Sequence, residues 1–270
     1  IQQNGLLVKS VKGDFSVNLI VSDKIDNISS PDLIIVATKS WQVEEVATQI
    51  KPILAKNTMV LPVQNGADNA AELRRRLRRK NVLAGLCKIV SKIEAPGIIN
   101  HFAYEPEIIF GEYDNMQTTR IKEVHLLFNQ AAIKNKVSQD IHLDIWRKFL
   151  FIGTVSGIGA ITRVPFGEFQ KDPNIMQLIQ QTANEMKDVA NAKSIKLSNE
   201  DIEKAIHMFL EMPGNTTASM QRDIMEGKPS ELENFNGYIV KEGIRLGVET
   251  PINTFIYHCL LPQERLARKA

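Results

Sequence analysis

The middle of the chain contains a stretch that is apolar on every side. Residues 146–162 read WRKFLFIGTVSGIGAIT, and after Lys148 no charged residue occurs for fourteen positions, until Arg163. The stretch is shorter than the roughly 20 apolar residues that cross a membrane. A helix that is apolar all round belongs in the centre of a fold. We therefore predict a buried helix against which the other elements of its domain pack.

Ahead of this helix, short apolar runs alternate with amphipathic stretches. Residues 32–40 and 58–66 contain continuous apolar runs, which are typical of buried parallel strands, and residues 15–20 alternate as a half-buried strand does. Strands that alternate with helices predict an α/β domain with a parallel sheet and helices on both faces. The remaining predicted elements are helices at 43–53, 68–80 and 119–134, strands at 82–90 and 136–139, and a hairpin or edge pair around Glu105 and Pro106.

From about residue 140 the strand pattern stops, and helical periods continue almost to the C-terminus. One helix start is marked by a capping box at 230–233, and Gly247 marks the end of the same helix. We therefore predict an α/β domain at 1–140 and an all-α domain at 141–270. The predicted helices span 172–195, 199–211, 216–226, 231–246 and 252–268, with Pro165, Pro173, Pro213, Pro229 and Pro251 in the breaks.

The predicted sheet domain contains no glycine-rich phosphate loop. A dinucleotide-binding domain begins with a strand, a GxGxxG turn and a helix. The nearest match, Gly157 and Gly159, lies inside the predicted buried helix and follows no strand. The chain opens at IQQNGLLVKS, which resembles the middle of a domain. We therefore expect one strand, turn and helix, about 30 residues, to lie upstream.

Composition narrows the class of protein. The apolar share of 43% and the charged share of 24% are those of a globular protein in water. The net charge of +2 favours no acidic partner, and no apolar run reaches the length of a membrane span. Cys87 and Cys259 offer no disulfide framework and suit a reducing compartment. We therefore expect a cytoplasmic protein with no membrane segment.

Two further features have plain structural explanations. The basic run AELRRRLRRK at 71–80 could bind nucleic acid, but Leu73 and Leu77 share one helix face and leave a solvated basic face opposite. The five histidines have no metal-ligand spacing, and His258 and Cys259 are neighbours that do not face each other on a helix. We therefore expect neither a nucleic-acid interface nor a metal site.

Polar residues gather where two predicted strands end. Thr38 and Lys39, with Gln42 nearby, follow the first strand, and residues 64–66 (QNG) follow the second. In an open parallel sheet, ligands bind beyond the carboxyl ends of the strands. Turn chemistry alone would explain either group, but two such strand ends together favour a binding site.

The buried helix presents a second candidate. Lys148 lies at its entrance and shares one face with Ile152 and Ser156, because residues four apart are neighbours on a helix. A lysine can reach a cleft with its ammonium while its stem stays packed. The alternative is an ordinary lysine at a helix end.

Five motifs, in order, resemble the ketopantoate reductase family (2-dehydropantoate 2-reductases). They are GLLVKSVKGDF, VATKSWQV, PVQNG, IWRKFLF and ASMQRDI followed by SELENFNGY, and the likeness covers nearly the whole chain. The resemblance implies a Rossmann-like N-terminal domain and a helical C-terminal domain, with the active site between them. It also implies reduction of 2-dehydropantoate to pantoate with NADPH, on the route to pantothenate.

The resemblance also implies roles for individual residues. Lys148 matches the catalytic lysine that donates the proton, and Glu231 matches a carboxylate at the cofactor and active site. Glu231 is expected in the first turn of its helix, where the helix dipole favours the ionised carboxylate. The other matches are Asn65 for nicotinamide and substrate, Lys39 and Gln42 for the cofactor, and Ser219 for the substrate carboxylate.

Three positions depart from the family pattern. Ile152 and Ser156 stand where relatives carry asparagines four and eight residues after the lysine, and Phe166 aligns with a third substrate asparagine. Loss of amide donors from a buried pocket changes which groups the pocket accepts. Ser156 remains a candidate substrate residue, and the partner is expected to be a small 2-oxo acid.

These departures leave several alternatives open. One is a family derivative that binds a ligand or partner without turning it over. NADPH rather than NADH follows from the resemblance alone. The quaternary structure is also open, and a homodimer is one alternative.

Overall fold

The computed structural model describes residues 1–269 and divides them into two compact units. The first unit comprises Ile1–Thr38, Val43–Gln64 and Ala70–Ile141. The second unit comprises Lys39–Gln42, Asn65–Asn69 and the residues from His142 onward. The second unit therefore contains both polar segments that follow the predicted strands. The division of the sequence at residues 140 and 141 stays a prediction.

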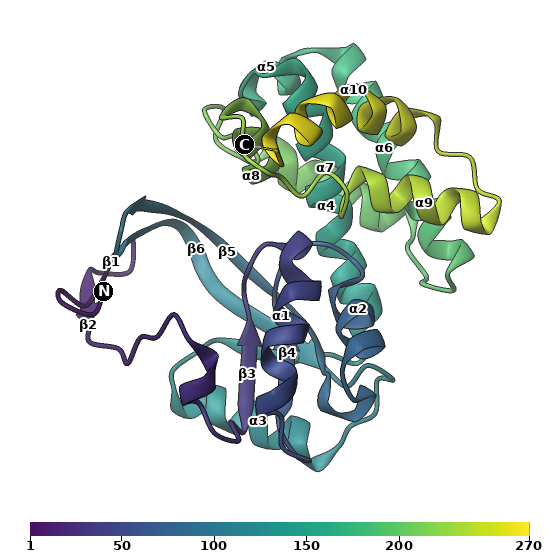
Figure 1. Cartoon of the computed structure of the whole chain (residues 1–270). Coiled ribbons are helices and arrows are strands. Elements are labelled where there is room, and N and C mark those ends of the chain that lie inside the picture. The colour runs from purple at the N-terminus through teal and green to yellow at the C-terminus, as the bar shows by residue number, and fades with distance from the viewer. Residues whose placement is uncertain (270) are drawn as a thin grey trace. The chain divides into compact units, whose positions relative to one another are not determined.

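The first unit is built from strands with helices between them, as its alternating pattern predicts (Figure 1). Parallel pairs join β3 to β4, β1 to β6 and β6 to β7, whereas β5 and β6 are antiparallel. The α/β class predicted for this part of the chain is confirmed. Its elements are β1 (Leu6–Ser10), β2 (Phe15–Val17), β3 (Leu33–Val36), α1 (Val43–Ile50), β4 (Met59–Pro62), α2 (Asn69–Arg76), β5 (Ala84–Ala95), β6 (Ile98–Gly111), α3 (Thr119–Gln130) and β7 (Asn135–Val137).

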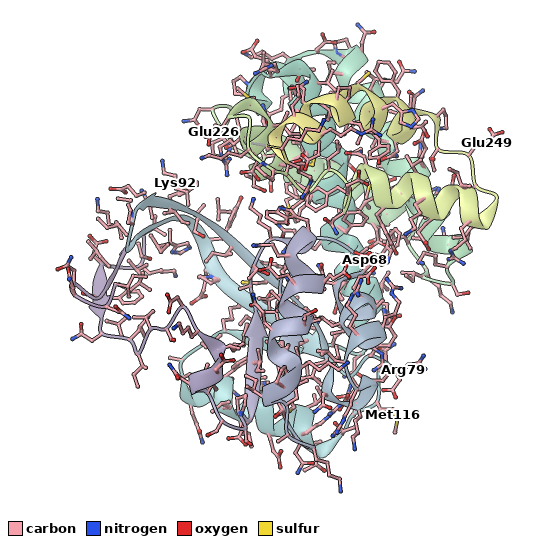
Figure 2. The ribbon with its side chains drawn as sticks, viewed as in Figure 1. Asp68, Arg79, Lys92, Met116, Glu226 and Glu249 are labelled. Carbon is pink, nitrogen blue, oxygen red and sulfur yellow. The ribbon has the colours of Figure 1, made fainter. Side chains whose placement is uncertain are left out.

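The turn predicted around Glu105 and Pro106 is wrong. Both residues lie inside β6, and the chain reverses instead at Gly97, whose φ of +76° favours glycine. The pairing of β5 with β6 shifts register between Lys88 and Val90, opposite the segment that holds Pro106. A bulge accommodates a proline that cannot donate to the ladder. The long ribbon of β5 and β6 results, and Lys92 lies on it (Figure 2).

Two strands are less buried than their patterns predict. The half-buried strand predicted at 15–20 is only the three-residue β2, in which every residue is exposed. Within β3, Ile35 is 44% exposed, although its run resembles a fully buried strand. Among the described residues, β3 pairs with β4 alone, so one edge of β3 has no ladder.

The core of the first unit lies between α3 and the strands β4 and β6. Leu61, Phe110 and Phe128 are almost fully buried, and the two phenylalanine rings meet edge to face at 5.4 Å. Leu73 on α2 and Leu77 directly after it are buried, and Arg75 pairs with Glu72 on the outer face of α2. The basic run is therefore an amphipathic helix.

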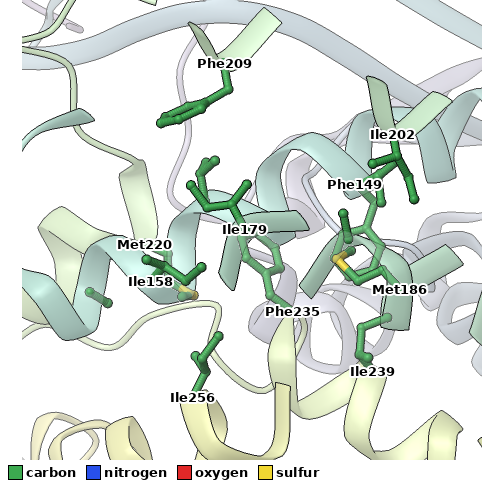
Figure 3. Close-up of a cluster of buried hydrophobic side chains, with 14 of the residues drawn as sticks. Phe149, Ile158, Ile179, Met186, Ile202, Phe209, Met220, Phe235, Ile239 and Ile256 are labelled. Carbon is green, nitrogen blue, oxygen red and sulfur yellow. The ribbon is translucent and has the colours of Figure 1, made fainter. Parts of the chain in front are cut away.

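The second unit is helical, and the buried helix predicted at 146–162 is confirmed within α4 (Ile141–Thr162). Figure 3 shows Phe149 and Ile158 of α4 among apolar side chains from the surrounding helices. No helix among residues 1–269 is both long and apolar enough to cross a membrane. The other helices are α5 (Phe166–Lys171), α6 (Pro173–Ala192), α7 (Asn199–Leu210), α8 (Ser219–Met225), α9 (Asn236–Leu246) and α10 (Pro251–Ala267).

One predicted helix start is wrong and the corresponding helix end is right. The capping box at 230–233 starts no helix, because α9 begins at Asn236. The hydroxyl of Ser230 does accept from the N–H of Leu232 at 3.2 Å, but the residues between form turns. Gly247 ends α9 with a φ of +70°, as predicted.

The glycines of α4 allow side chains from other helices to approach its backbone. A Cβ atom at Gly157 would lie 2.6 Å from Oδ1 of Asn236, and one at Gly159 would lie 2.6 Å from Oε1 of Gln221. At Gly153, a Cβ atom would instead meet the terminal methyl of Met186 at 2.7 Å. Two of the three glycines therefore make room for polar groups of α8 and α9.

We predict that Gly159→Ala lowers the free energy of unfolding by about 1–3 kcal/mol, although alanine gains about 1 kcal/mol of helix propensity. The new methyl group would collide with Gln221, which is fully buried and donates to the carbonyl of Val164 at 2.8 Å. Gly153→Ala is the matched control, because the flexible Met186 can move aside. Chemical denaturation measures both changes. A Gly159→Ala variant as stable as the control would contradict this packing argument.

Candidate active site

The second unit brings together polar side chains from three distant parts of the sequence. The N–H of Ser40 donates to Oε1 of Glu231 at 3.4 Å. The hydroxyl of Ser40 donates to the carbonyl of Asn65. The ammonium of Lys39 pairs with the carboxylate of Asp223, on α8. Three residues predicted for the site, Lys39, Asn65 and Glu231, are thus linked through Ser40 and its neighbour.

The segment that follows β3 is shaped by its own side chains. A 3-10 turn, η2 (Ser40–Gln42), begins directly after Lys39. Oε1 of Gln42 accepts from the N–H of Lys39 at 3.1 Å, and the N–H of Gln42 donates to the Lys39 carbonyl at 3.0 Å. Gln42 therefore holds the turn that presents Lys39 and Ser40. Its predicted contact with a cofactor stays a prediction.

The segment that follows β4 is a tight turn in which one residue must be glycine. Gly66 has a φ of +109°, a conformation that side chains with a Cβ atom rarely adopt. The carbonyl of Asn65 accepts from Nδ2 of Asn69 at 2.8 Å as well as from Ser40. Asp68, labelled in Figure 2, belongs to the same segment. The bend at Gly66 therefore lies beside Asn65, whose carbonyl is fixed by Ser40 and Asn69.

Glu231 is buried, with 3% of its surface exposed, and it lies ahead of α9 rather than in a helix turn. The expectation that a helix dipole favours its ionised form is therefore wrong. Burial raises the pKa of Glu231 above its ordinary value, because a carboxylate loses its water shell there. The charge of Lys39 and the hydrogen bond from Ser40 oppose this rise, and the charge of Asp223 adds to it.

Lys148, Ile152 and Ser156 lie on α4 at the predicted spacing of four residues. Lys148 and Ile152 are half-buried, whereas Ser156 is fully buried and its hydroxyl has no hydrogen-bond partner within the described structure. Phe166 is also buried, with its ring 5.2 Å from that of Phe209. Phe166 is therefore a core residue, and Ser156 offers an unused polar atom.

Ser219 is the first residue of α8 and is half-buried. The start of this helix is held by Gln221, whose Oε1 accepts from the N–H of Ala218 at 3.2 Å. The roles predicted for Lys148, Ser156 and Ser219 stay predictions. Sequence reasoning missed Asp223 and Ser40, although both lie within the motifs ASMQRDI and VATKSWQV.

The donor set suits a phosphorylated organic cofactor better than a metal. Lys39 supplies an ammonium, which phosphates recognise, and Gly66 adds a glycine whose φ is positive. Buried polar atoms without a partner in the described part of the chain include Oγ of Ser156 and Oδ1 of Asn234. Within residues 1–269, no three His, Cys, Asp or Glu side chains are arranged to hold a metal ion. These residues fit a nicotinamide nucleotide.

Two family models match the chain. The model described as ketopantoate reductase PanE/ApbA matches residues 1–115, and the model of the C-terminal part of ketopantoate reductase PanE/ApbA matches residues 140–264. Between them they cover most of the sequence.

Individual relatives are similar along their length at low identity. The 2-dehydropantoate 2-reductase of Aquifex aeolicus is 25% identical over 259 residues, which cover 94% of this chain and 83% of the relative. A ketopantoate reductase of the PanE/ApbA family from Ralstonia eutropha JMP134 has a similar structure, with a TM-score of 0.90 and 26% identity over 99% of this chain and 87% of that chain. A D-mandelate dehydrogenase in complex with NADH has a TM-score of 0.79 and 25% identity over 87% of this chain and 79% of that chain.

The raised pKa of Glu231 leads to a prediction about stability. A carboxyl group that binds its proton more tightly in the folded state stabilises the fold at low pH, and this contribution is lost as pH rises through the folded pKa. At a pH above the folded pKa, the cost of burying the ionised Glu231 therefore lowers the stability of the fold. We predict that Glu231→Gln unfolds at a higher temperature than the natural protein at pH 8, with a difference that shrinks toward pH 4.

Thermal unfolding at pH 4, 6 and 8 tests this expectation. Glu226→Gln is the control, because Glu226 is exposed (Figure 2) and a hydrogen bond from Lys228 lowers its pKa. The control is expected to gain no stability at pH 8. A Glu231→Gln variant that is less stable than the natural protein at pH 8 would show that the ionised carboxylate is well compensated.

Proposed function

Because this chain belongs to the ketopantoate reductase family, whose members are oxidoreductases that use a nicotinamide cofactor, we propose that it reduces 2-dehydropantoate or a related 2-oxo acid with NADPH. The product is the 2-hydroxy acid, and with 2-dehydropantoate the reaction belongs to pantothenate biosynthesis. The observation that carries the proposal is the cluster of Glu231, Ser40 and Asn65, with the Lys39–Asp223 pair beside it. It joins a buried carboxylate to the two segments that family likeness assigns to the cofactor.

Each group in the proposed site has a separate task. The bound cofactor would supply the hydride that adds to the keto carbon of the substrate. Lys39, Gln42 and Asn65 would hold the cofactor, and Ser219 would hold the substrate carboxylate. The keto oxygen gains negative charge as the carbon is reduced, so a cation and proton donor beside it lowers the barrier. Lys148 would provide both, and the proton would go to that oxygen.

Glu231 would orient a hydroxyl of the substrate or of the cofactor ribose, or the Lys148 ammonium. Its ionised form accepts hydrogen bonds only, whereas its protonated form can also donate one. Burial makes the difference between these forms large, because a carboxylate in a low-dielectric site interacts strongly with a nearby donor. Contact with a donor in the bound state would therefore stabilise the ionised form.

The composition of the α4 face that carries Lys148 supports a substrate with a more apolar tail than that of 2-dehydropantoate. Ile152 presents an alkyl side chain and Ser156 a short hydroxyl, where relatives in the family carry asparagine amides. The likeness to a D-mandelate dehydrogenase agrees with this direction, since mandelate has an aromatic tail. A pocket built with amides rejects apolar tails more strongly than an alkyl-lined pocket does.

A second candidate is a protein that binds a nucleotide or 2-oxo acid without turnover. The departures at Ile152 and Ser156 favour it. The two candidates differ in one measurement, because only an enzyme oxidises NADPH in the presence of a 2-oxo acid. The absorbance of NADPH at about 340 nm would therefore be followed with the full-length protein and a panel of 2-oxo acids. Binding of these compounds without any oxidation would favour the second candidate.

We predict that the specificity constant for an apolar 2-oxo acid such as phenylglyoxylate exceeds that for 2-dehydropantoate by about 10-fold or more. The double variant Ile152→Asn, Ser156→Asn should shift the preference back toward 2-dehydropantoate, because it restores two amides to the pocket. Met208→Asn, on the exposed side of α7, is the control and should leave the ratio unchanged. A natural protein that prefers 2-dehydropantoate over every apolar acid in the panel would contradict the prediction.

We predict that Lys148→Ala lowers the turnover number by about 10²–10⁴, the usual effect of losing a general acid. The affinity for NADPH should stay nearly unchanged, because the lysine is assigned to the substrate oxygen. Lys171→Ala is the control, since Lys171 is an exposed lysine of the same unit and pairs with Glu168. Steady-state kinetics measure the turnover number, and calorimetric titration measures the affinity for NADPH separately. If Lys148→Ala kept most of its turnover, the proton would come from another group.

A further inference from the structure

At the end of α10, the buried carboxylate of Glu264 pairs with Arg268, the residue that follows the helix, and both contact the residue before Glu231. Glu264 is 2% exposed, and its Oε1 accepts from Nε of Arg268 at 2.7 Å. Both oxygens of Glu264 lie 3.1 Å from the N–H of Ser230, and Oε2 accepts from the Ser230 hydroxyl at 2.5 Å. Arg268 also donates to the Ser230 carbonyl at 3.0 Å. Every polar group of Ser230 is therefore bound by Glu264 of α10 or by Arg268, which follows it.

These contacts constrain Glu231 on both sides along the chain. Ser230 precedes it, and the Ser230 hydroxyl accepts from the N–H of Leu232, which follows it. The carbonyl of Glu231 accepts from the N–H groups of Asn234 and Phe235 at 3.0 and 2.9 Å. Since no helix contains Glu231, its position depends on these turn contacts and on the anchor at Ser230.

The same ion pair also contacts the residue that follows the donor to Glu231. The guanidinium of Arg268 lies over the ring of Trp41, 5.0 Å from its centre. Trp41 follows Ser40, whose N–H donates to the Glu231 carboxylate. A guanidinium that stacks on an aromatic ring while it pairs with a carboxylate is held in one orientation. Arg268 thus contacts Ser230, which precedes Glu231, and Trp41, which follows the donor Ser40.

We propose that Glu264 and Arg268 are positioning residues, which fix the Glu231 carboxylate against Ser40 in the active site. This proposal rests on the proposed function, because it assigns the pair to the site in which Glu231 acts. Glu264 and Arg268 act through Ser230 and Trp41, and a displaced carboxylate would lose its alignment with whatever hydroxyl or ammonium it orients. Misplacement by a small distance is enough to slow an enzyme markedly.

The chain offers a closely matched control. Glu242, in α9, is also a poorly exposed carboxylate that pairs with an arginine of its own helix, Arg245, at 2.7 Å. A lysine from another part of the same unit, Lys193, completes its ion pairs. The ion-pair partners of Glu242 are Arg245 and Lys193, and these ion pairs include neither Ser230 nor Trp41. Glu242→Gln therefore removes a comparable structural ion pair without touching the proposed anchor.

The experiment is a double-mutant cycle in the full-length protein, with kcat/KM for the best 2-oxo acid as readout. Glu264→Gln is expected to lower kcat/KM by about 10-fold or more, within the loss that a misplaced catalytic group causes. In a Glu231→Gln background, the same change should cost less than about 2-fold, because its effect passes through Glu231. Glu242→Gln should lower thermal stability and leave kcat/KM within about 2-fold.

An equal loss from Glu264→Gln in both backgrounds would overturn the proposal, since a merely structural residue gives additive effects. Glu264→Gln is chosen over alanine because it keeps the side-chain volume and one acceptor oxygen, so the variant is expected to fold. Arg268→Lys, which keeps the charge but loses the forked contact, should behave like Glu264→Gln if the proposal is correct. An Arg268→Lys variant with unchanged kcat/KM would show that Arg268 has no positioning role.

A second readout separates this proposal from the proposed function. If none of the 2-oxo acids supports oxidation of NADPH by the natural protein, the proposed function fails. The double-mutant cycle then yields no kcat/KM values. Amide hydrogen exchange at Ser40 then decides the positioning role, because this N–H donates to Glu231. Faster exchange at Ser40 in Glu264→Gln, but not in Glu242→Gln, supports the proposal. Equal exchange in the two variants would overturn it.

Discussion

The burial of the Glu231 carboxylate is the constraint on which the site depends. A carboxylate removed from water is costly unless hydrogen bonds and opposite charge compensate it. Ser40 supplies a hydrogen bond, and Lys39 supplies opposite charge. These residues follow a strand almost two hundred positions earlier in the sequence, so the compensation exists only when the second unit has assembled. The site is therefore a product of the tertiary fold.

The helix α4 makes this assembly possible because it is both apolar and rich in glycine. Its apolar residues pack against helices on several sides, which places it at the centre of the core in Figure 3. Gly157 and Gly159 allow Asn236 and Gln221 to come close to its backbone. Gln221 holds the start of α8, and Asn236 is the first residue of α9. The same helix thus carries Lys148 and determines where Ser219 lies.

Hydrogen bonds between buried polar groups connect helices α6, α9 and α10. The carboxylate of Glu185 accepts from the N–H groups of Ile252 and Asn253 at the start of α10. Asn253 in turn accepts from the amide of Asn236 at 2.9 Å. At the opposite end of α10, Glu264 binds Ser230. Helix α10 is therefore tied at one end to the first residue of α9 and at the other end to a residue that precedes α9.

Local signals in the sequence were reliable where a single residue type determines the backbone. Gly247 ends α9 as expected, because only a left-handed conformation closes the helix there. The turn was predicted around Glu105 and Pro106, whereas the chain reverses at Gly97. Proline and glycine both favour turns. Pro106 lies in a bulge because long-range pairing with β5 overrides its local preference. Such pairing cannot be read from neighbouring residues.

The capping box at 230–233 shows the same limit inside the site. Its residues have the right types, but Ser230 is occupied by Glu264, so the helix starts five residues later than the box predicts. The family motifs did indicate that Lys39, Asn65 and Glu231 belong together, although spacing alone could not bring them together. Asp223 went unassigned because its partner is 184 positions away in the sequence.

The sequence by itself determined the class of fold, the buried helix and the family, because hydrophobic periodicity and ordered motifs are local properties of the chain. The tertiary structure decided in which direction the pKa of Glu231 shifts, which residues anchor it and where the β-ribbon turns. Each of these depends on desolvation or on a contact between distant segments. The free energy of such a contact depends on what surrounds it after folding, and this environment is absent from the linear order of residues.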